Sequence, residues 1–255
     1  MDREVLNRTW LSRTPVLTSL PFPHVVIDGI FKPDWVPLIE QAFPPVSDPR
    51  YRPAEHLHSR KASIQSPGAM PSLLLRALEE LRTPSVLNWL SEMTGFTYLK
   101  TDDEWFGEGV HTSTRGGFLD LHADFTLHPK GWTRVLNALI YFCPGWQDIW
   151  GGGLTLWSPT YSKIVPIQSN RMVLFETSDH SFHGFPDPLR CPEGRQRNVL
   201  QLYYYSAQYS HGPLLRTTVY PVSAQPMRKR LRRRLTALVG STGRSLLRQM
   251  VGREK

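Results

Sequence analysis

Hydrophobic positions change their spacing along the chain near residue 97. Before this point, apolar residues recur every three or four positions over 34–43, 71–81 and 84–95, which predicts amphipathic helices. After it, short alternating runs are separated by Gly, Pro, Asn or Asp, a pattern typical of antiparallel strands. We therefore expect helices in the first hundred residues, packed outside a β-sandwich or barrel over about 97–210.

Three stretches of the N-terminal part lack helical spacing. Residues 1–20 show no periodic pattern and predict an irregular lead-in, while 24–31 has the character of a short buried strand. Residues 46–70 are polar and rich in Pro, His and Ser, which predicts a loop. We expect this loop and the segment Glu104–Gly116 to form the rim of a pocket.

At 255 residues the chain suffices for one full core, and β-rich folds of this length often form a single domain. We divide it into three parts. Residues 1–96 are a helical support region of the same domain, 97–220 are the β core, and 221–255 are a tail. Leucines at helical spacing among arginines predict that this tail is basic and amphipathic.

The positive charge of the chain is concentrated in that tail. Ten Lys and Arg residues and one Glu lie between Arg228 and Lys255, a net +9, against +8 for the whole chain. The remainder is therefore close to neutral, which argues against a protein whose whole surface binds nucleic acid. A basic amphipathic tail can instead contact an anionic membrane surface or an acidic partner.

Other features predict a cytoplasmic protein. No apolar run approaches the roughly 18 residues that a transmembrane helix needs, and the charged N-terminus lacks the apolar stretch of a secretory signal. Cys143 and Cys191 are too few for a disulfide framework, and we interpret them as inert thiols in a reducing compartment.

Candidate chemistry begins in the run FLDLHADF. His122 and Asp124 are two residues apart, so on a strand both side chains would point to the same face. About sixty residues later, TSDHSFHGFPDP supplies a distal histidine, either His180 or His183. Two imidazoles and one carboxylate form the facial triad that non-heme Fe(II) oxygenases use, because the remaining metal positions stay open.

An arginine follows the distal histidine at the start of the run NVLQLYYYS. Arg195 and Arg197 are two residues apart, so on a strand both would point to the same face, and the pattern does not decide which of them enters the site. A planar guanidinium in this place can bind a carboxylate through two parallel hydrogen bonds.

Taken in order, the motifs HAD, RVLNALIYF, WGGGLTLW, SFHGFPDP and RNVLQLYYY resemble those of a known family. They are similar to the 2-oxoglutarate- and Fe(II)-dependent oxygenases, in the branch that includes the prolyl 4-hydroxylases and a bacterial subgroup. The resemblance covers about 97–206, and more loosely HVVIDGIFKPDWVPLIEQAFP. It implies a mainly β fold with flanking helices, built around a double-stranded β-helix of the jelly-roll or cupin type.

The resemblance makes His122, Asp124 and His183 both the metal ligands and the catalytic centre. His183 is preferred over His180 because of its place in SFHG. Related halogenases replace the carboxylate with a small residue, so Asp124 indicates hydroxylation. The other nearby histidines are interpreted as surface or pocket-lining residues: His111 and His128.

For the co-substrate, the resemblance implies that Arg197 pairs with the C5 carboxylate of 2-oxoglutarate. Tyr141 matches the position whose phenol supports this carboxylate, and Thr155 matches a residue that lines the co-substrate pocket. Fourteen residues separate His183 from Arg197, a wide spacing that the PDPLRCPEG turn accounts for. Arg195 is the competing residue.

The implied activity is hydroxylation of an unactivated C–H bond with Fe(II), 2-oxoglutarate and O2, with ascorbate as an optional cofactor. The expected substrate is a prolyl or proline-like residue, in a peptide or free, or a small metabolite. A second hypothesis is a catalytically silent jelly-roll that binds a partner through its basic tail.

Overall fold

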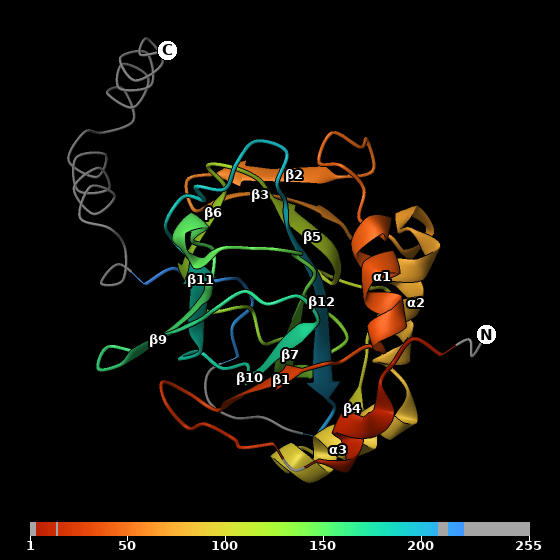
Figure 1. The fold of residues 1–255 in the computed structure, drawn as a ribbon. Helices are drawn as coiled ribbons and strands as arrows, with labels where there is room; N and C mark the ends of the chain where they lie inside the picture. The colour runs from red at the N-terminus through yellow and green to blue at the C-terminus, as the bar shows by residue number, and fades with distance from the viewer. Residues whose placement is uncertain (1–3, 14, 209–213, 222–255) are drawn as a thin grey trace, which may run out of the picture. The chain divides into compact units, whose positions relative to one another are not determined.

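A computed structural model of the chain describes residues 4–13, 15–208 and 214–221. In this part, an antiparallel sheet follows the strand order β1-β10-β7-β12-β5-β3-β6-β11-β8-β9, with β2 paired to β3 and β4 paired to β12 (Figure 1). Residues up to Tyr220 form one compact unit. The strands are β1 (His24–Asp28), β2 (Arg52–His56), β3 (Ser59–Ile64), β4 (Leu99–Lys100), β5 (Gly109–Ser113), β6 (Phe118–His122), β7 (Thr133–Tyr141), β8 (Leu154–Trp157), β9 (Ser162–Val165), β10 (Arg171–Glu176), β11 (Phe182–Phe185) and β12 (Arg197–Ser206).

The three predicted helices are present as α1 (Val36–Ala42), α2 (Ser72–Glu80) and α3 (Pro84–Thr94). Helix α3 ends at Gly95, whose positive φ of 76° is easily reached by a residue without a side chain. The helices α1 and α2 lie together along one flank of the sheet (Figure 1). Short 3-10 turns complete the described elements: Arg8–Ser12, Pro33–Trp35, Pro67–Ala69 and Asp148–Trp150.

The prediction of a loop over 46–70 was wrong in its central part, because β2 and β3 form a hairpin there. Strand β2 is mostly exposed and β3 carries polar residues, so neither shows the apolar alternation that marks a strand in sequence. Pairing with β5 and β6 holds β3 in the sheet instead. Residues 1–96 are thus more than a helical support region, since they contribute three strands.

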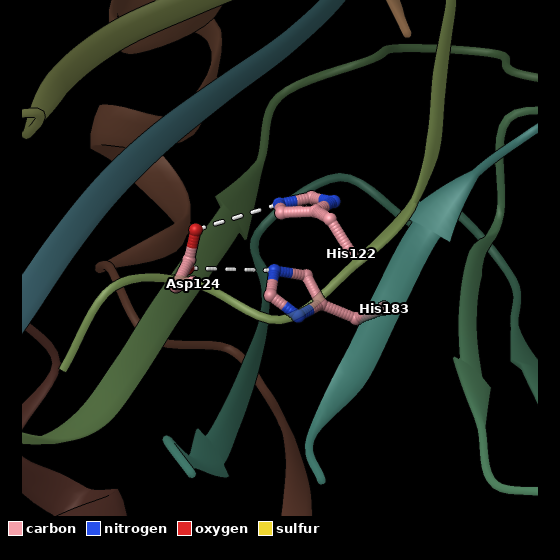
Figure 2. A group of neighbouring side chains, drawn as sticks. All are labelled: His122, Asp124 and His183. Carbon is pink, nitrogen blue, oxygen red and sulfur yellow. Dashed lines mark ion pairs between the residues drawn. The ribbon is translucent and has the colours of Figure 1, made fainter. Parts of the chain in front are cut away.

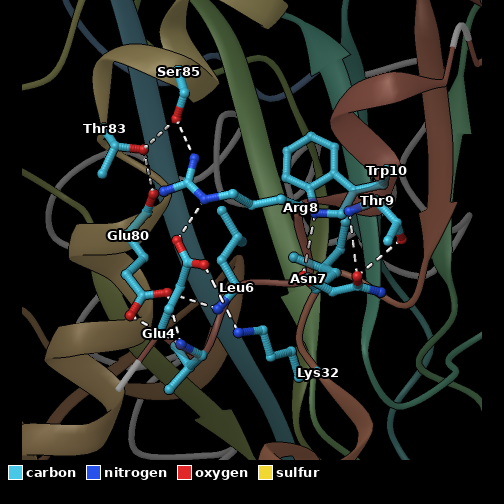
Figure 3. A network of polar contacts seen from close by, with 12 residues as sticks. Glu4, Leu6, Asn7, Arg8, Thr9, Trp10, Lys32, Glu80, Thr83 and Ser85 are labelled. Atoms are coloured by element: carbon cyan, nitrogen blue, oxygen red, sulfur yellow. Dashed lines mark hydrogen bonds and ion pairs between the residues drawn. The ribbon is translucent and has the colours of Figure 1, made fainter. Parts of the chain in front are cut away.

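The N-terminal lead-in is tied to α2 by a polar network (Figure 3). The backbone N–H groups of Val5 and Leu6 donate to the Glu80 carboxylate at 2.9 and 2.6 Å, and both apolar side chains are fully buried. The hydroxyl of Tyr204 on β12 donates to the carbonyl oxygen of Leu81, just beyond α2, at 3.1 Å. The lead-in therefore supports the helix that braces β12.

The structure bears on the expectations about membrane helices and cysteines for the described residues. None of the described helices is long and apolar enough to cross a membrane. Cys143 and Cys191 are both free and buried. Beyond Pro221 the predicted tail lies outside the described residues, so its amphipathic character and its contacts stay predictions, as does the cytoplasmic location.

Candidate metal centre

Two histidines face each other across neighbouring strands. His122 is the last residue of β6 and lies directly opposite His183 of β11, so both side chains share one face of the sheet. Their ring centroids are 4.4 Å apart. Both rings are buried, at 6% and 3% exposure.

Asp124 completes the group from a different kind of position. Strand β6 ends at His122, so the prediction that both residues lie on one strand was wrong. The carboxylate nevertheless points to the two rings, with Oδ1 at 3.4 Å from Nε2 of His122 and Oδ2 at 3.6 Å from Nε2 of His183 (Figure 2). One ligand atom from each residue lies within 4.8 Å of the others, a spacing that could hold a metal ion.

Backbone carbonyls set the orientation of both imidazoles. Nδ1 of His122 lies 2.9 Å from the carbonyl oxygen of Asp120, and Nδ1 of His183 lies 2.9 Å from that of Ser181. A carbonyl only accepts, so each Nδ1 carries a proton, and Nε2 is the ring atom that faces the other ligand candidates. Burial lowers the pKa of His183 to about 4, with His122 acting in the same direction, so this ring is neutral near pH 7.

The third ligand candidate is an ionised carboxylate. Burial alone would raise the pKa of Asp124, but Arg134 and the two histidines hold it below its ordinary value. Nδ2 of Asn137 donates to Oδ2 at 2.8 Å, and Nη1 of Arg134 lies 3.1 Å from the same oxygen. Two imidazole nitrogens and one hard anionic oxygen are a donor set that fits Fe(II).

A segment from the C-terminal end of the described chain supports this group. Ala123 lies between His122 and Asp124 in the chain and exchanges two backbone hydrogen bonds of 2.9 Å with Val219. The N–H of Thr126 donates to the carbonyl oxygen of Leu215 at 2.8 Å. We call Leu214–Tyr220 the C-terminal strap. Its Tyr220 ring lies 5.9 Å from the ring of His122.

Replacing Val219 by Pro is expected to lower metal affinity about tenfold, because Pro cannot donate to the Ala123 carbonyl that lies between two ligand candidates. Calorimetric titration of the metal-free protein with Fe(II) under anaerobic conditions measures this. The control is Val219→Ala, which keeps the N–H and should bind the metal like the wild type. Equal metal affinity in the Pro variant would show that the strap does not position the group.

Arg197 lines the same cavity as the three candidate ligands. It opens β12 and is buried, with Nε donating to the carbonyl oxygen of Gly152 at 2.8 Å and Nη2 donating to the phenol oxygen of Tyr141 at 3.1 Å. Gly152 has a positive φ of 84°, and a Cβ there would lie 2.6 Å from Leu189 and 3.2 Å from Arg197, so glycine favours this close approach. The remaining guanidinium N–H groups and the phenol proton are available to an acceptor in the cavity.

The structure separates the competing residues. His180 is exposed, with 84% of its side chain accessible, and does not reach the group. Arg195 is also exposed and donates to the carbonyl oxygen of Pro144. His111 lines the cavity, whereas His128 stacks on the ring of Trp132 elsewhere.

Thr155 does not line the cavity of the three candidate ligands. Along β8, Leu154 and Leu156 are buried, while Thr155 points to the opposite face and lines a different cavity with Gly151 and Pro186. Leu154 lines the cavity of the three candidate ligands in its place. Alternation along the strand explains this, because neighbouring residues face opposite sides of a sheet.

Some cavity residues were not singled out from the sequence, although two of them lie in the segments expected at the rim of the pocket, 46–70 and Glu104–Gly116. Lys61 lines the cavity from the hairpin that was predicted as a loop, and Ser113 does so from β5, a strand without an apolar pattern. Gln201 and Tyr203 reach it from β12, with Nε2 of Gln201 donating to the Tyr203 hydroxyl at 2.5 Å. Of the three strands that carry these residues, only β12 had been predicted as a strand, from its apolar and aromatic run.

Comparison with known proteins gives one family match. Residues 109–205 match the family model described as the 2OG-Fe(II) oxygenase superfamily. A search of curated proteins found no match.

Solved structures resemble the fold at low sequence identity. A prolyl-4-hydroxylase from Pseudomonas putida aligns with a TM-score of 0.54 and 16% identity, covering 72% of this chain and 92% of that one. A prolyl hydroxylase from Trichoplax adhaerens, in complex with a hypoxia inducible factor oxygen degradation domain peptide fragment, aligns with a TM-score of 0.51 and 16% identity, covering 77% and 86%. These likenesses confirm the predicted fold class, a mainly β double-stranded β-helix with flanking helices.

Proposed function

We propose that this protein is a 2-oxoglutarate-dependent dioxygenase that hydroxylates an unactivated C–H bond, a proposal supported by the match of residues 109–205 to the family model of the 2OG-Fe(II) oxygenase superfamily. The observation that carries the proposal is the group of His122, Asp124 and His183, with ligand atoms within 4.8 Å of one another. Arg197 in the same cavity adds the cation that a dicarboxylate co-substrate requires.

Each residue has a part in this proposal that follows from its contacts. The Nε2 atoms of His122 and His183 and the carboxylate of Asp124 hold Fe(II), which supplies the activation of O2 when bound. The guanidinium of Arg197 pairs with the far carboxylate of 2-oxoglutarate, and the phenol of Tyr141 donates to it. Because Tyr141 already accepts a hydrogen bond from Arg197, its own proton is directed elsewhere.

Apolar side chains complete the cavity by keeping water from the reacting atoms. Leu139, Leu154 and Phe185 line the same cavity as the candidate metal ligands and Arg197. Phe185 also lies under the guanidinium of Arg197, 4.0 Å from its ring centroid. This apolar lining strengthens the pairing of the guanidinium with a carboxylate, since the local dielectric constant is low.

For the substrate, we propose a prolyl or proline-like residue first and a small metabolite second. The branch resembled in sequence supports the first, and the two solved structures bear the name of prolyl hydroxylases. Ascorbate belongs in the assays as an accessory reductant.

The test has two stages. Anaerobic addition of Fe(II) and 2-oxoglutarate to the purified protein should give a weak visible charge-transfer band. Under air and with ascorbate, succinate release is then screened over proline, proline-containing peptides and metabolites, and the product should gain the mass of one oxygen atom. Folded protein that gives neither band nor succinate would contradict the proposal.

A further inference from the structure

Lys61 has no assigned part in the proposed chemistry, yet its side chain lines the cavity of the candidate metal ligands. Strand β5 lies between β3 and β12, and Ser113 is directly opposite Arg197. The pairing of Ala62 with Thr112 places Lys61 opposite Ser113 on the other side. Directly opposed residues share a face, so Lys61, Ser113 and Arg197 form one row whose ends are about 10 Å apart at the backbone.

The ammonium of Lys61 is unpaired within the part of the chain that the structure describes. Among the residues that the structure describes, no hydrogen bond or ion pair joins its Nζ, although the side chain is partly buried. Asp124 is the carboxylate that faces it in the cavity, but this group is already held by Arg134 and Asn137. Burial lowers the pKa of Lys61, as it does for a cation without a partner. A bound anion would offset this cost.

Building on the proposed function, we propose that Lys61 and Arg197 together clamp the far carboxylate of 2-oxoglutarate, with the Ser113 hydroxyl between them. With its keto-acid end at His122, Asp124 and His183, the co-substrate would extend its far carboxylate toward this row, which lines the same cavity. A carboxylate offers about four acceptor sites, which suffice for both cations and for neighbouring hydroxyl donors.

Lys61 could instead bind an anionic group of the substrate to be hydroxylated, but the surrounding residues favour this alternative less. Lys61 and Ser113 also line an adjoining cavity of about 380 Å³. Two acidic residues, Asp48 and Glu55, line that cavity as well, against one other cation, Arg60. A second anion there would meet carboxylates, whereas the inner cavity combines Lys61 with Arg197.

The experiment is an anaerobic titration of the Fe(II)-loaded protein with 2-oxoglutarate, followed by the charge-transfer band. Lys61→Met is expected to raise the Kd by about 10- to 100-fold, the effect of losing one charged hydrogen bond. The matched control is Lys163→Met, which removes a lysine of β9 that contacts His24 outside the cavity. Its Kd should equal that of the wild type.

A second ligand separates a direct contact from a structural effect. The monocarboxylate 2-oxobutanoate keeps the keto acid but lacks the far carboxylate, so Lys61→Met should leave its Kd within about twofold of the wild type. Equal weakening of both acids, or an unchanged Kd for 2-oxoglutarate, overturns the clamp while leaving the proposed function intact. A wild-type protein without any band overturns the proposed function itself, and the clamp with it.

Discussion

Replacing His183 by Ala is expected to lower 2-oxoglutarate-dependent succinate formation by more than about 100-fold. Even partners that only orient a metal ligand cost 10- to 100-fold when removed, and His183 is proposed as a ligand itself. Its Nε2 faces Asp124 at 3.6 Å, and its Nδ1 lies 2.9 Å from the carbonyl oxygen of Ser181, so the ring is oriented with Nε2 toward the site. Metal affinity should fall along with activity.

The matched control is His180→Ala, three residues away along the chain. His180 is the other histidine that the motif allows, but its side chain is 84% exposed and contacts Asp179 instead. Succinate release and Fe(II) titration should therefore match the wild type. Loss of activity in the His180 variant, with the His183 variant still active, would show that His180 and not His183 is the distal metal ligand.

The second large effect is expected at Arg197. Arg197→Met should raise the Kd for 2-oxoglutarate by about 100-fold or more, because it removes a charged fork and leaves the carbonyl of Gly152 without its donor. The anaerobic charge-transfer titration measures this Kd. Fe(II) binding in the absence of 2-oxoglutarate should change little, since Arg197 makes no contact with the three candidate ligands that hold the metal.

Arg195→Met serves as the control for this prediction. Arg195 has the same strand parity in the sequence, but it is exposed and its Nη1 donates to Pro144 at the surface. We expect its Kd for 2-oxoglutarate to equal the wild-type value. A weakening in the Arg195 variant as large as that in the Arg197 variant would refute the assigned role of Arg197.

Local signals explain why the helices could be predicted. Helix α3 opens with Pro84 and ends at Gly95, and both preferences act within a few residues. Strands β7 and β12 were equally legible, because both are buried along their whole length and consist largely of apolar and aromatic residues. In such segments the tertiary structure adds little that the local pattern does not already favour.

The candidate site was predictable to a smaller extent. The order of residue types supported His122, Asp124 and a distal histidine, and the structure brings His183 into the group while leaving His180 outside. The reason that Asp124 reaches the group was not predictable. Strand β6 stops at His122, and Val219, almost a hundred residues later, holds the backbone in between.

Thr155 and Lys61 show where the sequence does not predict which side chains line the cavity. Thr155 was selected by its place after a glycine-rich turn, but the phase of β8 turns its side chain to the other face. Lys61 lies in the segment 46–70, which was expected at the pocket rim, but it was not singled out, because its hairpin has no apolar face of its own and depends on pairing with β5 and β6.

By itself, the sequence determined the helices of the first hundred residues, the β-rich core and the set of residue types suited to an iron site. These follow from local periodicity, from turn chemistry and from the donor preferences of the metal. Only the tertiary structure decided which histidine and which arginine enter the cavity, and that Lys61 joins them. Strand register and phase decide these contacts, and they depend on pairing between segments far apart in the chain.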